Sequence, residues 1–552
     1  MSQEIMRIAA SFCRRHPAWA VMIAAAVMLV IPAALTPFNT KGEPREAIVA
    51  LSMLMSGDWV LPVSFGADIP YKPPFLAWMI AMLSLPFGSV SELTARLPSI
   101  LACMAIGATV ASFVRRDMGW SGGRAFAAAL LTITTVEVWR GAGACRVDMV
   151  LTAAITGACV TLYRLALYGG VGRFAGAVAL MTVAVLTKGP VGMVLPCLII
   201  AVWAIGARLG SRRFWTLAAI VAAAALLSLV IPAWWYAEAY RRGGREFLDL
   251  AMEENFGRMT GTMSYASHNN PWWYNLQTLV AGLLPYTLIP VLALFEVRRP
   301  SGSRIFRNMG RASLLAVAAC VVTLVFYTIP SSKRSVYLLP IYPFIAPGLL
   351  WLWEWLAIRS PKVERLFGSL ITIVAVVVAV ALLAAPFQPW LSEVSLIASL
   401  LSAVAVGTVV IIARHSGPVK STLAMIATIY TAIGIAILPP VMTAKTDRGM
   451  ACTVAATAGP ADPVWELITD DPLLRYYTIG FYLSDRIRQL PDEIPAGGGW
   501  LLTSPDDAAA YLAAHPGISL TPVAEKRKSC DTRRPMALYR LDNTNSIHSS
   551  DR

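Results

Sequence analysis

Long uncharged apolar runs recur along this chain from Ala18 to Pro440, and they restrict its fold more than any other feature. A helix needs about 20 apolar residues to cross the roughly 30 Å hydrocarbon core of a bilayer. The 552 residues are 57% hydrophobic and only 14% charged, whereas soluble domains are about a quarter charged. The sequence therefore predicts an α-helical polytopic membrane protein.

About thirteen of the runs are predicted to span the membrane. They cover residues 18–36, 93–114, 124–137, 149–168, 174–188, 191–207, 215–236, 273–296, 312–329, 336–356, 367–385, 393–413 and 422–440. The first run follows basic residues as a signal peptide would, but it is long and no small-residue cleavage site follows it, so we expect a retained span. The apolar run 75–87 is too short to cross and is predicted to be juxtamembrane.

The basic residues predict the orientation. If the N-terminus is cytoplasmic and 75–87 does not cross, the arginine clusters fall in cytoplasmic loops, among them Arg115 and Arg116. A crossing by 75–87 would move most of these clusters outside. The net charge of +14 follows the same distribution, and no nucleic-acid-binding module is present. We therefore expect a multi-pass protein of the bacterial inner membrane whose C-terminal region is periplasmic.

Residues 1–440 are predicted to form the membrane domain, with outer loops at 37–92 and 237–272. In the second loop, residues 244–258 have the mixed apolar and acidic pattern of an interfacial helix. Residues 441–552 are predicted to form a small extracytoplasmic α/β domain with a frayed tail: 499–503 indicates a strand and 505–516 a capped helix. Cys452 and Cys530 both fall here, and a disulfide between them is left open.

Two acidic residues are the candidates for catalysis. Glu43 precedes Pro44, which suits a first helical position. It is either a general base or metal ligand, or an ordinary acid favoured by the helix dipole. Asp148 lies at the outer end of a predicted span, where carboxylates are costly and often functional. The alternative for Asp148 is a helix cap paired with Arg146.

Cations on the predicted outer face break the positive-inside trend, which indicates an anionic ligand such as a lipid phosphate. Lys188 lies at a Gly-Pro break and either lines a cavity or snorkels to the surface. His268 precedes a Trp-Trp-Tyr belt and is either structural or a ligand. No Walker A motif, Rossmann fingerprint or HExxH motif is present, so no nucleotide cofactor is expected. The other residues predicted to line the cavity or to bind the anionic ligand are Arg45, Lys72, Arg258, Lys333, Arg334 and Tyr337.

These segments resemble the polyprenyl-phosphate-sugar-dependent glycosyltransferases of the C superfamily, in the aminoarabinose transferase and protein O-mannosyltransferase group (glycosyltransferase families 39 and 83). The matching motifs run in order from residue 42 to residue 343. They include GEPREA, YKPPFLAW, ARLPS, RVDMVLT, LTKGPVG and FYTIPSSKRSVYLLPIYP. The resemblance implies about thirteen transmembrane helices, juxtamembrane helices and an outer α/β domain.

The resemblance also implies a reaction: transfer of a hexose or pentose from an undecaprenyl-type phosphate to an envelope acceptor, lipid A or another glycan, by inverting displacement. Glu43 matches the base and Asp148 the second acidic position. Arg45, Lys72 and the segment containing Lys333, Arg334 and Tyr337 match the region that holds the donor phosphate.

Two departures from the family pattern leave alternatives open. Gly42 stands where family members often have the Asp of an Asp-Glu pair, so Asp148 could share the work of Glu43, or the protein could be an inactive scaffold. Tyr71 stands where aminoarabinose transferases tend to have Glu, which leaves protein O-mannosylation as an alternative. A lipid or solute transporter is the rival from another class, although no repeated halves are evident. A divalent metal held by Glu43 and His268 is compatible with the motifs.

Overall fold

The structure is a computed structural model that describes residues 2–70, 72–254, 269–296, 310–388, 394–413, 418–469, 474–495 and 497–543. Its contacts divide the chain into two compact units. Unit 1 comprises Met1–Ala33, Tyr71–Leu76 and Arg96–Leu438, and unit 2 comprises Ala34–Pro70, Ala77–Ala95 and Pro439–Arg552. The second unit thus joins the first predicted outer loop to the C-terminal region.

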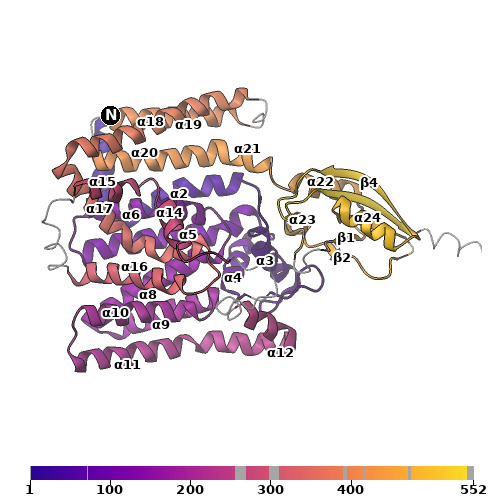
Figure 1. Cartoon of the computed structure of the whole chain (residues 1–552), viewed down its shortest axis with the longest axis horizontal. Helices are drawn as coiled ribbons and strands as arrows, with labels where there is room; N and C mark the ends of the chain where they lie inside the picture. The colour runs from indigo at the N-terminus through magenta and orange to yellow at the C-terminus, as the bar shows by residue number, and fades with distance from the viewer. Residues whose placement is uncertain are drawn as a thin grey trace, which may run out of the picture. The chain divides into compact units, whose positions relative to one another are not determined.

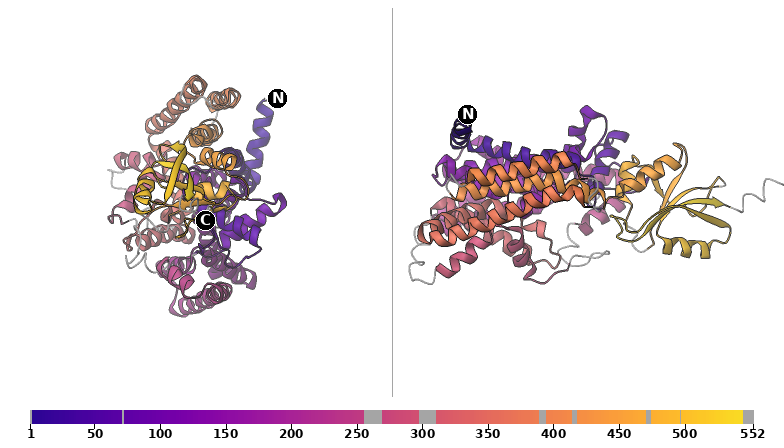
Figure 2. Two further views of the ribbon diagram at one scale, coloured as in Figure 1. Left: turned by 90° about the vertical axis from the view of Figure 1, so that its right-hand side faces the viewer. Right: turned by 90° about the horizontal axis from the view of Figure 1, so that it is seen from above.

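Unit 1 consists almost entirely of helices that run roughly alongside one another (Figures 1 and 2). They are α1 (Ser2–Arg15), α2 (Pro17–Leu35), α5 (Glu92–Arg116), α6 (Gly122–Ile133), α7 (Val136–Ala142), α8 (Val147–Tyr168), α9 (Val171–Lys188), α10 (Val191–Gly206), α11 (Ser211–Ser228), α12 (Val230–Met252), α14 (Tyr274–Gly282), α15 (Leu288–Glu296), α16 (Arg311–Thr328), η5 (Ser335–Ile341), α17 (Tyr342–Arg359), α18 (Pro361–Ala384), α19 (Leu396–Ala413), α20 (Pro418–Ala432) and η8 (Ile433–Ile437).

Nine helical stretches in the described part of the chain are long and apolar enough to cross a membrane. Helix α18 shows why lipid must surround them: Ile373, Val377 and Val380 are 59–60% exposed. In water such a continuous apolar face would be a liability, whereas in a bilayer it faces hydrocarbon. The predicted polytopic α-helical class is confirmed.

One predicted span is interrupted, and one predicted interfacial helix begins at a kink. The predicted span 273–296 divides into α14 and α15, separated by a segment that contains Pro285; a proline has no backbone N–H and cannot continue a helix ladder. The predicted interfacial helix 244–258 begins at a kink within α12: the backbone leaves helical geometry at Gly244 (φ 58°, ψ −142°), and the second of the two helices that meet there runs to Met252. Glycine tolerates this backbone conformation because it has no Cβ. Residues 255–258 lie outside the described part.

The first part of unit 2 contains two helices, α3 (Pro44–Ser56) and most of α4 (Phe75–Ser84), the latter followed by the short turn η1 (Leu85–Phe87). The 10 residues of α4 are about 15 Å long at 1.5 Å per residue, which is about half the thickness of the hydrocarbon core. This length agrees with the prediction that 75–87 does not span.

The C-terminal part of unit 2 is a small α/β structure, as predicted. Its elements are α21 (Leu438–Thr443), α22 (Arg448–Thr457), β1 (Val464–Leu467), α23 (Tyr477–Tyr482), β2 (Ile487–Gln489), β3 (Gly499–Thr503), α24 (Pro505–Ala514), β4 (Ile518–Lys526) and β5 (Met536–Asn543). The five strands have the order β2-β1-β3-β5-β4. Strand β1 is parallel to β2 and β3, whereas β5 is antiparallel to β3 and β4.

Helix α24 packs on this sheet (Figure 1). Its Ala508 joins a core that includes Trp465, Leu501 and Leu541 from three strands. The helix begins at the predicted position because the Ser504 hydroxyl accepts a hydrogen bond from the backbone N–H of Asp507 at 3.0 Å.

The disulfide left open between Cys452 and Cys530 is absent, since both cysteines are free. Cys452 is exposed on α22, whereas the Cys530 sulfur lies 3.3 Å from the Thr478 hydroxyl oxygen.

Candidate functional site

Glu43, the predicted base, lies in unit 2 at the N-terminus of α3. Pro44 occupies the first helical position as predicted, and the Glu43 carbonyl oxygen accepts a hydrogen bond from the backbone N–H of Ala47 at 3.1 Å. The residue is only 5% exposed. A buried carboxylate at a helix N-terminus is stabilised by the unpaired N–H groups and by the helix dipole. Arg45 is in the first turn of α3 and forms an ion pair with Glu46 at 3.6 Å.

Asp148, the second predicted acid, lies in unit 1 and pairs with Lys188. The Lys188 ammonium is 2.5 Å from an oxygen of the Asp148 carboxylate. Asp148 is in the first turn of α8 and Lys188 is the last residue of α9, so each charge lies at the helix end that the dipole favours. The ion-pair partner is therefore Lys188 on the neighbouring helix, whereas Arg146 acts on Asp148 through its charge.

The break between α9 and α10, directly after Lys188, places the Lys188 side chain beside Asp148. Gly189 ends α9 with φ 76°, a conformation that suits glycine, and Pro190 precedes the first turn of α10. Helix α10 then packs closely against α9: a Cβ at Gly192 would lie 2.3 Å from the Ala184 carbonyl carbon. The TKGPVG motif therefore encodes a tight helix-to-helix turn with a cation at its start.

Further predicted residues gather around this ion pair. The Lys188 ammonium lies over the Tyr337 ring, 4.4 Å from its centroid, and the Tyr337 ring is stacked on that of Tyr327 at 5.3 Å. The charge of Lys72 also acts on the Asp148 carboxylate. Unit 1 thus brings together Lys72, Asp148, Lys188 and Tyr337, which come from four separate segments of the sequence.

Lys333 has a more specific structural role than the sequence indicated. It is 4% exposed, and its ammonium donates to the backbone carbonyls of Pro330 (2.6 Å), Asn270 (3.1 Å) and Ser331 (3.4 Å). An ammonium has three N–H donors, so these carbonyls account for all of them. Lys333 therefore ties the loop that carries Arg334 to the segment before α14.

A second buried carboxylate in unit 1 was not predicted. Glu137, in the short helix α7, is 5% exposed and forms an ion pair with Arg140 at 2.7 Å. The same Arg140 nitrogen donates to the Ser335 hydroxyl at 2.9 Å, directly after the Lys333–Arg334 pair. The available signal was an acid three residues before an arginine at the end of a predicted span.

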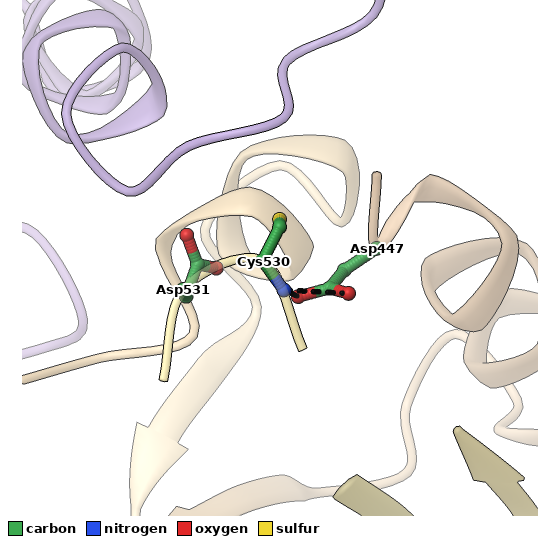
Figure 3. Close-up of side chains that lie close together, drawn as sticks. All are labelled: Asp447, Cys530 and Asp531. Atoms are coloured by element: carbon green, nitrogen blue, oxygen red, sulfur yellow. Dashed lines mark hydrogen bonds between the residues drawn. The ribbon is translucent and has the colours of Figure 1, made fainter. Parts of the chain in front are cut away.

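A third polar cluster lies in the C-terminal part of unit 2 and contains Asp447, Cys530 and Asp531 (Figure 3). Their potential ligand atoms lie within 4.8 Å of one another. The oxygens of Asp447 already accept hydrogen bonds from the Lys526 ammonium (2.7 Å), the Ser529 hydroxyl (2.6 Å) and the backbone N–H of Cys530. This donor set fits a network that holds the loop after β4, because a metal would have to displace these hydrogen bonds.

Asp531 is satisfied in the same way: it accepts hydrogen bonds from the backbone N–H (2.8 Å) and the hydroxyl (3.0 Å) of Thr478. Burial, together with the nearby Asp447 charge, raises the pKa of Asp531 to about 7. Among the described residues Glu43 does not belong to a group of three metal-ligating side chains. Arg258 and His268, the other predicted cavity residues, lie outside the described part of the chain.

Comparisons with known proteins bear on this arrangement. A model of the dolichyl-phosphate-mannose-protein mannosyltransferase family matches residues 71–236, a segment that contains Lys72, Asp148 and Lys188. The crystal structure of ArnT from Cupriavidus metallidurans in the apo state matches 95% of this chain and 98% of its own length, with a TM-score of 0.71 and 21% identity. The chain has the fold of this ArnT structure.

The ArnT structure bound to undecaprenyl phosphate gives the same match, with a TM-score of 0.70, 22% identity and coverage of 94% and 97% of the two chains. An undecaprenyl phosphate-alpha-4-amino-4-deoxy-L-arabinose arabinosyl transferase of Pseudomonas fluorescens is 28% identical over 353 residues, 62% of this chain and 58% of that protein. An uncharacterized protein of Aquifex aeolicus is 28% identical over 55% of this chain and 65% of its own length.

The chain thus spans less than two thirds of these two curated relatives. The resemblance to C-superfamily glycosyltransferases that the motifs predicted is confirmed.

Proposed function

We propose that this protein is a glycosyltransferase that moves a sugar from a polyprenyl phosphate to an envelope acceptor at the periplasmic face of the inner membrane. The observation that carries the proposal is the polar cluster of unit 1, in which the buried Asp148 at the N-terminus of α8 pairs with Lys188. Unit 2 contributes a second buried carboxylate at a helix N-terminus, Glu43, and the chain has the fold of an ArnT. The named curated relative, an arabinosyl transferase, supports undecaprenyl phosphate as the carrier.

Glu43 is the proposed general base. Its carboxylate takes the proton from an acceptor hydroxyl, and the resulting oxygen attacks the anomeric carbon of the donor sugar. The bond from that carbon to the phosphate oxygen breaks, and its electron pair leaves with the polyprenyl phosphate. Because attack and departure occur on opposite faces of the carbon, the configuration inverts.

The leaving phosphate gains negative charge in this step, so catalysis requires positive groups that face it. We assign this role to Arg45, Lys72, Arg334 and Tyr337, since cations and a phenol can donate to phosphate oxygens. Lys333 contributes by ordering the Arg334 segment through its carbonyl contacts. The Asp148–Lys188 pair holds the Tyr337 ring in place through the ammonium that covers it.

Sugar transfer from an undecaprenyl-phosphate donor in proteoliposomes tests the assignment of the base. Glu43→Gln keeps the shape of the side chain but removes the basic oxygen, and we expect turnover to fall by about 10²–10⁴-fold. Glu246→Gln is the control, because it makes the same change at an exposed carboxylate of α12 to which no role is assigned; its turnover should stay within a few-fold of wild type. Wild-type turnover in Glu43→Gln would contradict the mechanism.

Lipid A or another envelope glycan is the proposed acceptor, on the basis of the arabinosyl transferase relative. Protein O-mannosylation is the second candidate, because the family model that matches residues 71–236 is that of a protein mannosyltransferase. Mass spectrometry of lipid A and of envelope proteins, from cells with and without this protein, separates the two. A sugar lost from lipid A supports the first candidate, and a hexose lost from protein supports the second.

The proposed orientation has a cytoplasmic N-terminus and a periplasmic C-terminal domain. Single cysteines introduced into a cysteine-free variant at exposed positions of α24 and α1 test it. A membrane-impermeant maleimide should label the α24 position in spheroplasts and the α1 position only after lysis. Labelling of the α1 position in intact spheroplasts would reverse the orientation.

A further inference from the structure

We propose that the C-terminal α/β region positions the catalytic base, and that α23 is the element through which it does so. The proposal rests on the role of Glu43 given above. Helix α23 packs against α3, the helix that begins directly after Glu43, within one compact unit. If this contact sets the position of α3, residues more than 400 positions away in the sequence determine where the base lies.

Two buried phenylalanines bracket the α3 segment and insert into the C-terminal part of unit 2. Phe38, before α3, is 0% exposed and packs edge-on against Phe481 with 4.9 Å between ring centroids. Phe65, after α3, is 2% exposed and packs edge-on against Tyr477 at 5.7 Å. Removing an aromatic side chain from water stabilises the contact that buries it. The segment that carries Glu43 is therefore anchored at both ends by α23.

Hydrogen bonds fix the backbone at the same two residues. The backbone N–H of Phe38 donates to the Tyr482 hydroxyl at 3.2 Å, and its carbonyl accepts from the Thr446 hydroxyl. The backbone N–H of Phe65 donates to the Asp485 carboxylate at 2.8 Å. A buried backbone group that loses its hydrogen-bond partner is destabilising, so these bonds hold the loop in one register against α23 and the residues around it.

Gly480 is the closest point of this contact. A Cβ at this position would lie 2.6 Å from Cζ of Phe65 and 3.4 Å from Cδ1 of Ile48, which is in α3 one turn after Glu43. The first distance is too short for any real Cβ contact, so a methyl group must displace the Phe65 ring, and with it the segment that follows α3. Only glycine allows α23 to approach this closely.

Two further contacts link the same parts of the chain. Asp68, three residues after Phe65, forms an ion pair with the Arg475 guanidinium at 2.9 Å. The Tyr482 hydroxyl that accepts from Phe38 also donates to Glu92 at 2.8 Å. The loop therefore contacts the C-terminal region before α3, after α3 and again beyond α4, as a positioning role requires.

The expected effect follows from the sensitivity of catalysis to geometry, because a misplacement of about 1 Å can reduce turnover about 100-fold. We expect Gly480→Ala, in the full-length protein in proteoliposomes, to lower kcat for sugar transfer by about 10–100-fold. The KM for the undecaprenyl-phosphate sugar should stay within about three-fold, because the residues assigned to the donor phosphate are mostly outside this contact.

Gly449→Ala is the matched control. Gly449 is a helical glycine in the neighbouring helix α22, and a Cβ there would meet nothing within 4 Å. Its kcat should equal that of wild type. A second substitution, Phe65→Leu, removes the ring atom that the Gly480→Ala methyl would meet, and the double variant should recover part of the lost kcat. A role in stability alone would not produce this rescue together with an unchanged KM.

If Gly480→Ala does not fold, Tyr482→Phe provides the same test, because it keeps the ring but removes the oxygen that accepts from Phe38. We expect its kcat to fall by about 3–10-fold at constant KM. Wild-type kcat per folded molecule in both variants would overturn the positioning role. The proposed function fails separately, if Glu43→Gln retains activity or if the wild-type protein transfers no sugar.

Discussion

The Asp148–Lys188 pair leads to a quantitative prediction. The Asp148 side chain is 11% exposed and that of Lys188 is 23% exposed, with 2.5 Å between the charged atoms. Removing one member of a buried pair leaves the other charge uncompensated, which lowers the free energy of unfolding by about 3–5 kcal/mol. For Lys188→Met we expect the free energy of unfolding to fall by about 3 kcal/mol, the lower end of this range. The N-terminus of α8 and the nearby Lys72 still stabilise the Asp148 carboxylate in this variant.

For Asp148→Asn we expect a smaller loss, about 1–2 kcal/mol. The remaining Lys188 ammonium still lies over the Tyr337 ring at 4.4 Å, and a desolvated cation–π contact contributes up to about 2 kcal/mol. The double variant leaves neither charge buried, so its total loss should be about 1–2 kcal/mol, well below the sum of the two single losses. The coupling energy is therefore about 3 kcal/mol.

Equilibrium unfolding in mixed micelles of a mild detergent and sodium dodecyl sulfate, followed by tryptophan fluorescence, measures these four proteins. Glu354→Gln is the control, since its pair with Arg124 is 31–36% exposed and should be worth no more than about 1 kcal/mol. Additive losses in the double variant, with a coupling below about 0.5 kcal/mol, would refute the reasoning. Transfer activity that stays low in the stable double variant would show that Asp148 also serves the reaction.

Two further predictions concern the C-terminal α/β region. Burial raises the pKa of Glu466 from 4.5 to about 8, so the folded state holds a proton that the unfolded state has lost, and stability should fall as pH rises from about 4.5 to about 8. Glu466→Gln should reduce the slope of this dependence in unfolding measured from pH 5 to pH 8, and the raised pKa of Asp531 should supply part of what remains. The exposed Glu493→Gln should keep the wild-type slope, and an unchanged slope in Glu466→Gln would contradict the assignment. Ser504→Ala removes the cap of α24 and should destabilise the protein by about 1 kcal/mol; a loss below about 0.3 kcal/mol in the same unfolding assay would show that the cap is not needed.

The elements that the sequence predicted well have local causes. Apolar runs became helices such as α5 and α8 within two or three residues of their predicted ends, because hydropathy reports directly on the bilayer environment. In the C-terminal region, Ser504 and Pro505 predicted the start of α24, and the run 499–503 predicted β3. Each of these signals is complete within a few neighbouring residues.

The sequence named most of the residues of the candidate site, but it did not predict which of them contact one another. Asp148 was weighed against Arg146, two residues away, whereas its partner is Lys188, 40 residues away on α9. Lys333 was assigned to phosphate by its charge, yet three backbone carbonyls engage its ammonium. Glu137 was missed because nothing in its sequence context shows that it is buried. Charge type can be read locally, but the partner of a charge depends on which helix ends meet.

The sequence by itself determined that this chain enters a membrane and where helices such as α5, α8 and α24 begin. It also supplied the charged residues that we propose for the donor phosphate. These properties follow from hydropathy, helix capping and residue type, which act over one or two helical turns. The tertiary structure decided that α23 packs against the helix that follows Glu43, and that Lys188 neutralises Asp148. Such contacts arise from packing between segments that are distant in the sequence, where shape and buried charge are compatible only in the folded chain.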